Sequence, residues 1–357
     1  MRIVAHNGAR IFGGAERATV LLLRGLADRG HIVTLLCNDR IVAAEADARG
    51  VASQIVPIGG DIALPHALRL SAVLRRLDPD AFLIGTFKKL FLASLGARLA
   101  GVPRVIARVG LETDTPRNAK YRLALRRWVD GVGVNAERMV EPFASLEDFG
   151  AEKVRLIHNG VRAPASSGAS GALRAQLGIP PEVLVAGTIA RLVSQKRIDR
   201  LLQAVALASD SVHCIIAGDG NRRAELAANV ASLGIGRRVH FLGHRDDTGT
   251  VLRALDVYVV SSDREGLSNS MLEAMAAGVP IISTPVSGAS DALGTDRPGG
   301  VITKFDAQTI ARALDELHIN RSRLKEMGFA ARHRAETTFS FERMVDEWEA
   351  FLTGSRN

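Results

Sequence analysis

SSDREGLSNSMLEAMAAGVPII, residues 261–282, is the stretch that decides the fold of this chain. The apolar residues 257–260 before it predict a short buried strand, and residues 263–269 predict a polar loop. Residues 270–277 are typical of a helix, which Gly278 and a nearby proline stop. The stretch therefore predicts a strand-to-helix turn of the kind that parallel α/β sheets repeat.

Two glutamates bracket this turn, Glu265 on the loop and Glu273 inside the helix. Gly266 lets a ligand approach the backbone, and the free amides of the helix start point at the same space. The arrangement suggests a sugar nucleotide site. Two ordinary interpretations compete: Ser270 and Glu273 have the spacing of a capping box, and a lone loop glutamate is usually solvated. Taken alone, each glutamate is better explained by these ordinary roles. The residues in loops further upstream, considered together with the two glutamates, favour the ligand site instead.

Short apolar strands alternate with longer helical patterns along most of the chain, as in parallel sheets built from βαβ units. The strand candidates are residues 2–7, 31–37, 81–85, 104–108 and 131–135 in the first half, and 183–190, 213–220, 239–243, 257–262 and 280–285 in the second. The predicted fold class is α/β, with two Rossmann-like, doubly wound domains. We expect them to face each other across a cleft lined by the carboxyl ends of both sheets.

A segment rich in Ala, Ser, Gly and Pro separates the two halves and predicts a linker near residues 163–180. We expect an N-terminal domain over residues 1–165 and a C-terminal domain over residues 175–340. The last amphipathic stretch lies within residues 341–357 and needs a surface to cover, so we expect it to pack back on the first domain.

Composition narrows the class of protein. The chain has 357 residues, enough for two cores, and only 4% are aromatic, so aliphatic residues build those cores. Its apolar runs are far shorter than the roughly 20 residues that span a bilayer. The first residues enter a strand directly, and we expect a cytoplasmic protein. Cys37 and Cys214 lie beside apolar runs in opposite halves, which predicts buried thiols, with neither a disulfide nor a metal site.

The formal net charge of +8 is concentrated in residues 88–127. Within this window an apolar stripe with helical spacing lies beside a basic face; the stripe comprises Tyr121, Ala124, Leu125 and Trp128. Two interpretations stay open. Either the helix lies on an anionic membrane, peripherally on its inner face, or the stripe packs into the core and the basic face is solvated. Nucleic acid is not expected as a partner, because no recognition motif is present.

Residues with informative chemistry follow the predicted strands, where doubly wound sheets bind ligands. They are Gly13 and Gly14, Arg191 and Lys196, Gly218 and Asp219, and Glu265. A guanidinium fork and an ammonium can grip a diphosphate, although two solvated cations are the alternative. Charge that develops on a leaving phosphate needs a divalent metal or fixed positive groups. This chain offers fixed groups in Arg191 and Lys196.

Other motifs are absent or ordinary. Asp78-Pro79-Asp80 matches D-x-D, but it lies where a helix ends and a strand begins, so a boundary turn is expected and a metal ligand is not. The chain has no Walker sequence and no complete G-x-G-x-x-G, which disfavours ATP and nicotinamide chemistry.

Five motifs together resemble the retaining glycosyltransferases of family 4, which have the two-domain GT-B fold. They are GGAER at 13–17, HNGV at 158–161, RLVSQKRID at 191–199, AGDG at 217–220 and EGLSNSMLEAMAAGVPII at 265–282. The likeness spans nearly the whole chain. By it, the N-terminal domain (1–165) would be the acceptor side, and the C-terminal domain (175–340) would bind the nucleotide sugar. It implies a hexosyltransferase type of enzyme that moves a sugar from a nucleoside diphosphate sugar to a glycan or lipid-linked acceptor. The anomeric configuration would be retained, without a metal or another cofactor. We expect a role in bacterial surface polysaccharide or lipopolysaccharide synthesis.

The resemblance also implies roles for single residues. Arg191 and Lys196 would hold the diphosphate, Glu265 the hydroxyl groups of the transferred sugar, and Glu273 the ribose. The remaining binding residues would be Gly13 and Gly14 from the first domain, Gly218, Asp219 and His244 beside the nucleoside, and Gly266, Leu267, Ser268 and Asn269 at the phosphate or sugar.

One departure from the family pattern concerns the strand after Val102-Pro103, where Val109 stands at the position of a frequent histidine. We expect Arg108 or Glu112 to take over that function, with Arg108 contacting the donor sugar or the acceptor. Two other functions stay open: a sugar nucleotide epimerase or hydrolase of the same fold, and a non-catalytic scaffold of a glycan assembly complex.

Overall fold

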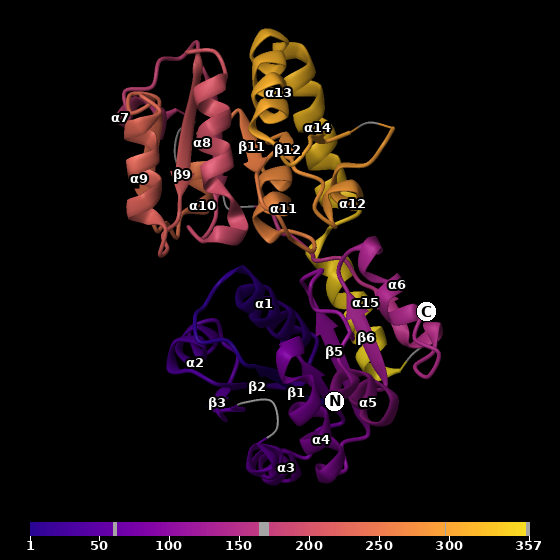
Figure 1. The fold of residues 1–357 in the computed structure, drawn as a ribbon. Coiled ribbons are helices and arrows are strands. Elements are labelled where there is room, and N and C mark those ends of the chain that lie inside the picture. Colours follow the sequence, from indigo (N-terminus) through magenta and orange to yellow (C-terminus); the bar gives the residue numbers. More distant parts are fainter. Residues whose placement is uncertain (60–62, 164–170, 297, 355–357) are drawn as a thin grey trace. The chain divides into compact units, whose positions relative to one another are not determined.

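The computed structural model describes residues 1–59, 63–163, 171–296 and 298–354. The chain forms two compact units (Figure 1): Met1–Asn159 with Phe341–Asn357, and Gly160–Ser340. The division falls just before the predicted linker at 163–180, because the Val161 amide donates to the Phe339 carbonyl (2.8 Å) within the second unit. Residues 164–170 of that linker lie outside the described residues.

The first unit is built around a parallel sheet with the strand order β3-β2-β1-β4-β5-β6-β7. Its strands are β1 (Arg2–Asn7), β2 (Ile32–Cys37), β3 (Ser53–Ile55), β4 (Ala81–Ile84), β5 (Arg104–Val109), β6 (Gly131–Val134) and β7 (Val154–Leu156). Its helices are α1 (Gly14–Asp28), α2 (Arg40–Asp47), α3 (Leu64–Leu77), α4 (Leu90–Ala100), α5 (Ala119–Trp128), α6 (Glu141–Ala144) and α15 (Phe341–Thr353).

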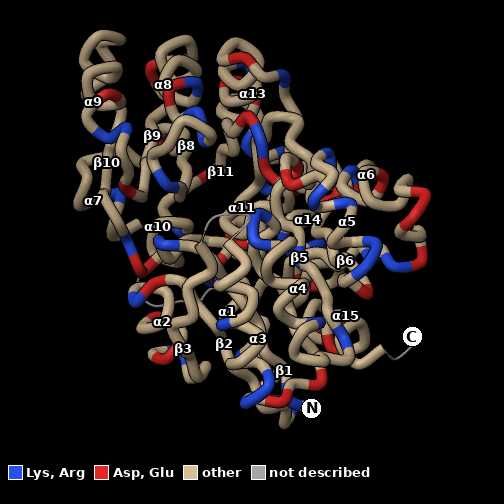
Figure 2. The backbone as a smooth tube through the Cα atoms, turned by 60° about the horizontal axis from the view of Figure 1, so that its bottom comes forward, with Lys and Arg blue, Asp and Glu red and all other residues tan. Residues whose placement is uncertain are grey.

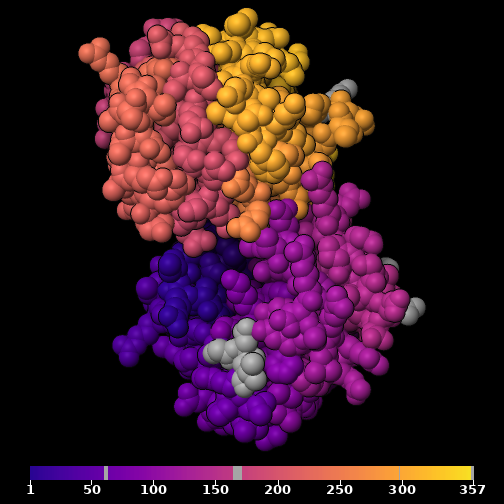
Figure 3. Space-filling view, in the orientation of Figure 1, coloured from indigo at the N-terminus to yellow at the C-terminus, as the bar shows by residue number. Residues whose placement is uncertain are grey.

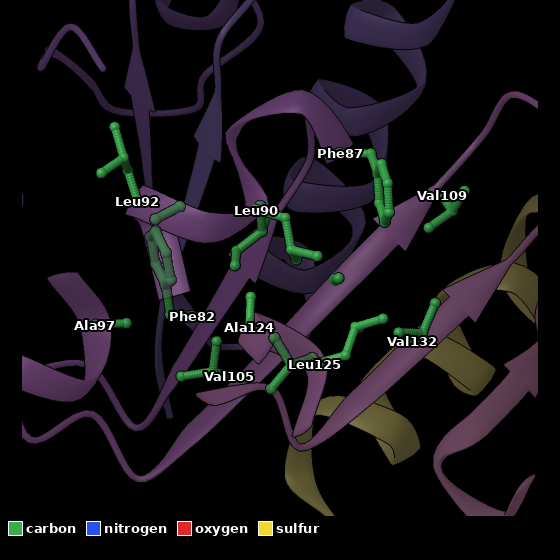
Figure 4. Packing of buried hydrophobic residues seen from close by; sticks show 14 of the residues in the cluster. Phe82, Phe87, Leu90, Leu92, Ala97, Val105, Val109, Ala124, Leu125 and Val132 are labelled. Carbon is green, nitrogen blue, oxygen red and sulfur yellow. The ribbon is translucent and has the colours of Figure 1, made fainter. Parts of the chain in front are cut away.

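Successive side chains of a strand point to opposite faces, so each sheet separates two apolar layers. In β5, Val105 and Ala107 join the layer formed with α3, α4 and α5. Figure 4 shows part of this layer, with Val105 near residues of α4 and α5. Ile106 joins the other layer, with α1, α2 and α15. Both cysteines are buried and free, as predicted.

The C-terminal helix α15 packs in the core of the first unit, where Trp348 is 2% exposed. Glycines of β6 make room for it: a Cβ atom on Gly133 would lie 2.4 Å from Cη2 of Trp348. The alternation GVGV in β6 therefore places valines toward one layer and glycines toward α15.

The second unit has a parallel sheet with the order β10-β9-β8-β11-β12-β13. Its strands are β8 (Leu184–Ile189), β9 (Val212–Ala217), β10 (Val239–Gly243), β11 (Val257–Val260), β12 (Ile281–Ser283) and β13 (Gly300–Ile302). Its helices are α7 (Ala172–Gln176), α8 (Ile198–Leu207), α9 (Arg223–Ser232), α10 (Thr248–Arg253), α11 (Asn269–Ala276), α12 (Ala289–Leu293), α13 (Ala307–Ile319) and α14 (Arg321–Thr337).

Helices cover both faces of this second sheet as well. One layer contains residues of α8, α9 and α13, and the other contains residues of α7, α10, α11 and α12. Figure 3 shows the surface atoms coloured along the chain, from indigo at the N-terminus to yellow at the C-terminus. Leu173 of α7 is buried in the second unit, so residues 172–176 are part of a folded layer and not of a linker.

The fold class predicted from sequence is confirmed, with three strands added. The strands β3, β7 and β13 have three residues each and lie at sheet edges, so they are too short for a readable pattern. The Asp78-Pro79-Asp80 sequence is a boundary turn, as expected: Asp78 and Asp80 accept hydrogen bonds from Arg2, at 3.0 and 2.8 Å. No helix of the described residues is both long and apolar enough to cross a bilayer.

Candidate functional site

Strand order selects one place on each sheet for a ligand. In both sheets the order reverses beside the first strand of the unit, so the loops after that strand and after its later neighbour diverge and leave a crevice. In the second unit these neighbours are β8 and β11. The loop after β8 carries Arg191 and Lys196, and the loop after β11 carries Glu265. The topology thus brings together residues that lie about seventy positions apart.

Lys196 and Glu265 are in direct contact. The Lys196 ammonium donates to Oε1 of Glu265, and the Ser262 hydroxyl donates to the same carboxylate oxygen at 2.8 Å. The side chains of Lys196 and Glu265 are only 19% and 11% exposed. Desolvation strengthens their attraction. A diphosphate and a sugar hydroxyl can each replace one partner of this pair, since one carries negative charge and the other donates a hydrogen bond.

Tyr258 forms the floor beneath this pair. Its hydroxyl donates to the Ile189 carbonyl (3.0 Å) and lies 2.8 Å from the Ser270 hydroxyl. Burial raises the pKa of Tyr258, against the opposing effect of its hydrogen bonds. A cavity of about 10 Å³ remains between these groups, lined also by Thr188 and Ser268, which is room for about one water molecule. The floor is therefore rigid, polar and neutral.

The glycine loop after β9 closes against the loop after β8. Gly218 has φ +127, and a Cβ atom there would lie 2.0 Å from the Ala190 carbonyl oxygen, so only glycine fits. The Leu192 amide donates to the Asp219 carbonyl at 2.9 Å. The backbone on both sides of Arg191 is thereby fixed, while its side chain is exposed. Arg191 is thus held at the surface on the same loop as Lys196.

The helix α11 begins one residue earlier than predicted, with Ser268 as its N-cap. Ser270 is therefore inside the helix and turned to Tyr258, so the predicted alternative of a Ser270–Glu273 capping box is wrong. Glu273 is half-buried one turn further on. The residues before the helix are fixed by the core: Leu267 is 3% exposed, and the Gly266 carbonyl accepts from the Gly288 amide at 3.0 Å.

Two predicted binding residues have solvent-facing side chains. The His244 side chain is 76% exposed and lies 3.3 Å from Asp246. Its neighbour Gly243 accepts a hydrogen bond from the Gly218 amide (2.6 Å), so the backbone at least adjoins the glycine loop. The Asp219 carboxylate accepts from the Gly220 amide at 2.7 Å. Neither side chain contacts Lys196 or Glu265 in the described hydrogen bonds.

Gly13, Gly14 and Arg108 belong to the first unit. Gly13 is the N-cap of α1, and its amide donates to the Glu16 carboxylate at 3.0 Å, so a side chain of the helix itself already occupies this amide. The Gly13-Gly14 pair thus combines a tight helix entry with a half-exposed backbone.

Arg108 is 8% exposed at the end of β5. Its guanidinium donates to the Thr19 hydroxyl (2.7 Å) and to the Asn159 side-chain carbonyl (3.0 Å). Burial lowers the pKa of Arg108 to about 10, against the charge of Glu16. Its hydrogen bonds thus go to neutral groups under the first turns of α1. Contact of Arg108 with a sugar stays a prediction.

The apolar stripe of α5 packs into the core. Ala124 and Leu125 are fully buried (Figure 4). Tyr121 and Trp128 are partly buried and pack against the same cluster. The second of the two interpretations is therefore confirmed for the stripe. Acidic and basic residues are interspersed over both units (Figure 2). The exposed cations within residues 88–127 are Lys88, Arg117, Arg122, Arg126 and Arg127.

Sequence reasoning missed the residues that support the pair. Ser262 donates to Glu265 directly, and Tyr258 lines the same small cavity as Lys196 and Glu265. Arg197, Arg200 and Asp263 form ion pairs around the same two loops. The sequence does carry a sign of these ion pairs, because basic and acidic residues occur together in KRIDR (196–200) and SSDRE (261–265), which contain Lys196 and Glu265. The two segments can be recognised as partners only once β8 and β11 are known to be neighbouring strands.

Comparison with known proteins gives two family matches that cover most of the chain. The model described as "Glycosyltransferase Family 4" matches residues 12–163, and "Glycosyl transferases group 1" matches residues 170–334. One relative is the "Lipopolysaccharide core biosynthesis glycosyltransferase LpsE" of Rhizobium meliloti (strain 1021). It is 30% identical over 326 residues, which cover 88% of this chain and 89% of the relative.

Two further comparisons agree in length and fold. The "GDP-mannose-dependent alpha-(1-6)-phosphatidylinositol monomannoside mannosyltransferase" of Mycobacterium tuberculosis is 27% identical and covers 93% of this chain and 92% of its own. The crystal structure of Anabaena Alr3699/HepE in complex with UDP superimposes with a TM-score of 0.86, at 19% identity, over 99% of this chain and 100% of that one.

Proposed function

The chain belongs to the group 1, family 4 glycosyltransferases, and we propose that it transfers a sugar from a nucleoside diphosphate donor to a glycan or lipid-linked acceptor with retained configuration. The observation that carries the proposal is the half-buried contact of Lys196 with Glu265 between β8 and β11. It provides a cation for phosphate and an acceptor for sugar hydroxyls at adjacent positions.

In the proposed reaction, the bond between the anomeric carbon and the donor phosphate oxygen breaks, and a bond from the acceptor oxygen to that carbon forms on the same face. The acceptor proton passes to the departing phosphate oxygen. Lys196 and Arg191 stabilise the charge that develops on the diphosphate, so no metal is required in this scheme. Glu265 holds the hydroxyl groups of the transferred sugar, and Glu273 holds the ribose.

The donor and the acceptor are proposed from relatives. The Rhizobium relative is named as a glycosyltransferase of lipopolysaccharide core biosynthesis, which favours a surface glycolipid as the acceptor. The mycobacterial relative is named for GDP-mannose, and the Anabaena structure contains UDP, so both bases are candidates for the donor.

We also propose a peripheral contact with an anionic membrane from the cytoplasmic side. It would use the exposed face of α5, where Arg122, Arg126 and Arg127 lie beside the half-exposed Leu123. Because the apolar stripe of α5 is buried, the attraction would be electrostatic and screened by salt. Flotation with phosphatidylglycerol vesicles that is independent of salt and lipid charge would contradict it.

The test is release of nucleoside diphosphate from UDP-, GDP- and ADP-sugars in the presence of EDTA, with and without a lipid-linked glycan extract. Release that depends on the extract and disappears in Glu265→Ala supports metal-independent transfer. Release without acceptor supports the hydrolase or epimerase. A folded protein that releases nothing supports the scaffold, and analysis of the product's anomeric configuration by NMR tests retention.

A further inference from the structure

The backbone next to Lys196 adopts an unusual conformation. Arg197 has φ +48 and ψ +46, the left-handed region, which glycine adopts freely. For a residue with a Cβ atom this conformation costs about 1–2 kcal/mol. Among the described residues only Asp78 shares a positive φ without being glycine. A strained arginine beside a predicted phosphate ligand suggests that its side chain has a specific task.

The Arg197 side chain joins two carboxylates. Its Nη2 donates to Asp199 at 3.0 Å, and its Nη1 donates to both oxygens of Asp263 at 3.2 Å. Asp263 accepts a second guanidinium, that of Arg200, at 2.6 Å. Burial raises the pKa of Asp263, but the hydrogen bonds from Arg200 and Arg197 outweigh it, and the pKa lies below its ordinary value. Asp263 is thus a charged anchor for both arginines.

These ion pairs connect the two loops that carry the site. Asp263 lies two residues before Glu265, and Arg197 follows Lys196 directly. Backbone bonds support the same contact: the Asp263 amide donates to the Gln195 carbonyl at 3.0 Å, and the Ser261 hydroxyl donates to the Lys196 carbonyl at 2.9 Å. The Arg200 side chain, 6% exposed, also donates to the Ser261 carbonyl at 2.6 Å.

We propose that Arg197 and Asp263 are positioning residues, which fix the loop of Lys196 against the loop of Glu265 so that both groups meet one donor. The inference rests on the proposed function. Lys196 must leave Glu265 when a diphosphate binds, and its ammonium stays in place only if the backbone beneath it does not move. Partners that orient the ligands of a metal typically contribute about 10–100-fold to affinity or activity, and we expect an effect of the same order from residues that orient a phosphate-binding group.

The experiment is a double-mutant cycle of Asp263→Asn and Lys196→Met, read as kcat/KM for nucleoside diphosphate release from the UDP- and GDP-sugar panel. We expect Asp263→Asn to lower kcat/KM about 10–100-fold in the wild-type background. With Lys196→Met present, we expect a further loss below about threefold, because the group that it positions is gone. Equal losses in both backgrounds would overturn the proposal, since a general structural role does not depend on Lys196.

A second variant separates positioning from stability. Arg197→Gly removes the ion pairs but also relieves the strained conformation, so we expect an unchanged or higher Tm together with a loss of activity like that of Asp263→Asn. Full activity in Arg197→Gly would contradict the proposal. Arg332→Ala, which removes an exposed ion pair of α14, is the matched control and should change neither reading. Inactive wild-type protein would count against the proposed function, whereas active wild type with additive losses would count against positioning alone.

Discussion

In both sheets the strand order reverses beside the first strand, as β2-β1-β4 in the first unit and β9-β8-β11 in the second. The two units differ in the side chains that lie near this reversal. In the second unit, the loops after β8 and β11 present an ion pair, Lys196 and Glu265, whose side chains are partly open to solvent. In the first unit, His6 is buried at the end of β1, and Arg108 is buried at the end of β5, on the far side of β4. Both bond to neutral partners. The shared strand order therefore determines where a ligand can bind in each unit, and the side chains at that place determine which ligand it can bind.

The difference fits a division of labour within the proposed function. A nucleoside diphosphate carries charge and demands charged partners, whereas an acceptor glycan offers neutral hydroxyl groups, which amides and hydroxyls recognise. The first unit also differs in construction, because α15, from the far end of the chain, contributes to one of the apolar layers on its sheet.

Removal of the Trp348 side chain should destabilise the first unit selectively. Trp348→Ala empties the space between α15 and the glycines of β6, and substitutions of this kind cost about 3–5 kcal/mol. The two tryptophans, Trp128 and Trp348, both lie in the first unit, so the fluorescence of the remaining Trp128 follows its unfolding in urea. Phe329→Ala, at a side chain of α14 that is 77% exposed, is the control. Equal midpoints for both variants would contradict the assigned role of α15.

Neutralising Glu265 should damage activity while the fold persists. Glu265→Gln keeps the size of the side chain but removes the charge opposite Lys196, and we expect kcat/KM to fall about 10²–10³-fold, as for the loss of one preorganised group. Glu336→Gln, at a half-exposed glutamate of α14, is the matched control. An active Glu265→Gln enzyme would show that the charged pair in the second unit is not the centre of the reaction.

The features that the sequence alone predicts are those that repeat along the chain, namely the βα units of both sheets and the motifs in the loops that follow the strands. The βα alternation gives both sheets, since buried strands such as β8 and β11 form readable apolar runs with a loop motif after each. The glycine loop at Gly218 is likewise local, because the requirement for glycine comes from one tight turn. The edge strands β3, β7 and β13 were missed because such three-residue, partly exposed strands carry too little pattern, whereas the five-residue edge strand β10 was predicted.

Which charged side chains pair with each other could not be predicted from the sequence. Charge counts placed Arg98 and Arg108 in one basic window, but Arg98 pairs with Asp130 at 2.6 Å and Arg108 is buried. Lys196 and Glu265 were singled out separately, yet their contact depends on β8 lying beside β11. Asp263 looked like an ordinary loop residue, because its partners Arg197 and Arg200 are more than sixty positions away. Partners at such separations are fixed by tertiary structure.

Acid should weaken the first unit through His6. Burial, together with the charge of Lys89, lowers the pKa of His6 from 6.5 to about 4, against a hydrogen bond with Asn38. The folded state thus favours neutral His6, and its contribution is complete above pH 6.5 and lost as the pH falls toward 4. The shift corresponds to about 3 kcal/mol. We expect urea unfolding followed by tryptophan fluorescence to show this loss in wild type and a smaller loss in His6→Gln. Identical pH dependence in both would assign the effect to other groups.

Replacement of Arg108 should give the smallest effect and the sharpest contrast with the second unit. Arg108→Met removes the guanidinium that bonds Thr19 and Asn159, and Arg108→Lys keeps the charge but loses the fork. If Arg108 serves the acceptor or the sugar, turnover falls about tenfold in Arg108→Met, equivalent to roughly 1.4 kcal/mol, and less in Arg108→Lys. Calorimetric affinity for UDP or GDP should not change, because the proposed diphosphate ligands lie in the second unit. Unchanged turnover in Arg108→Met would restrict Arg108 to the structure of the first unit, and weakened nucleotide binding would contradict the division of roles between the two units.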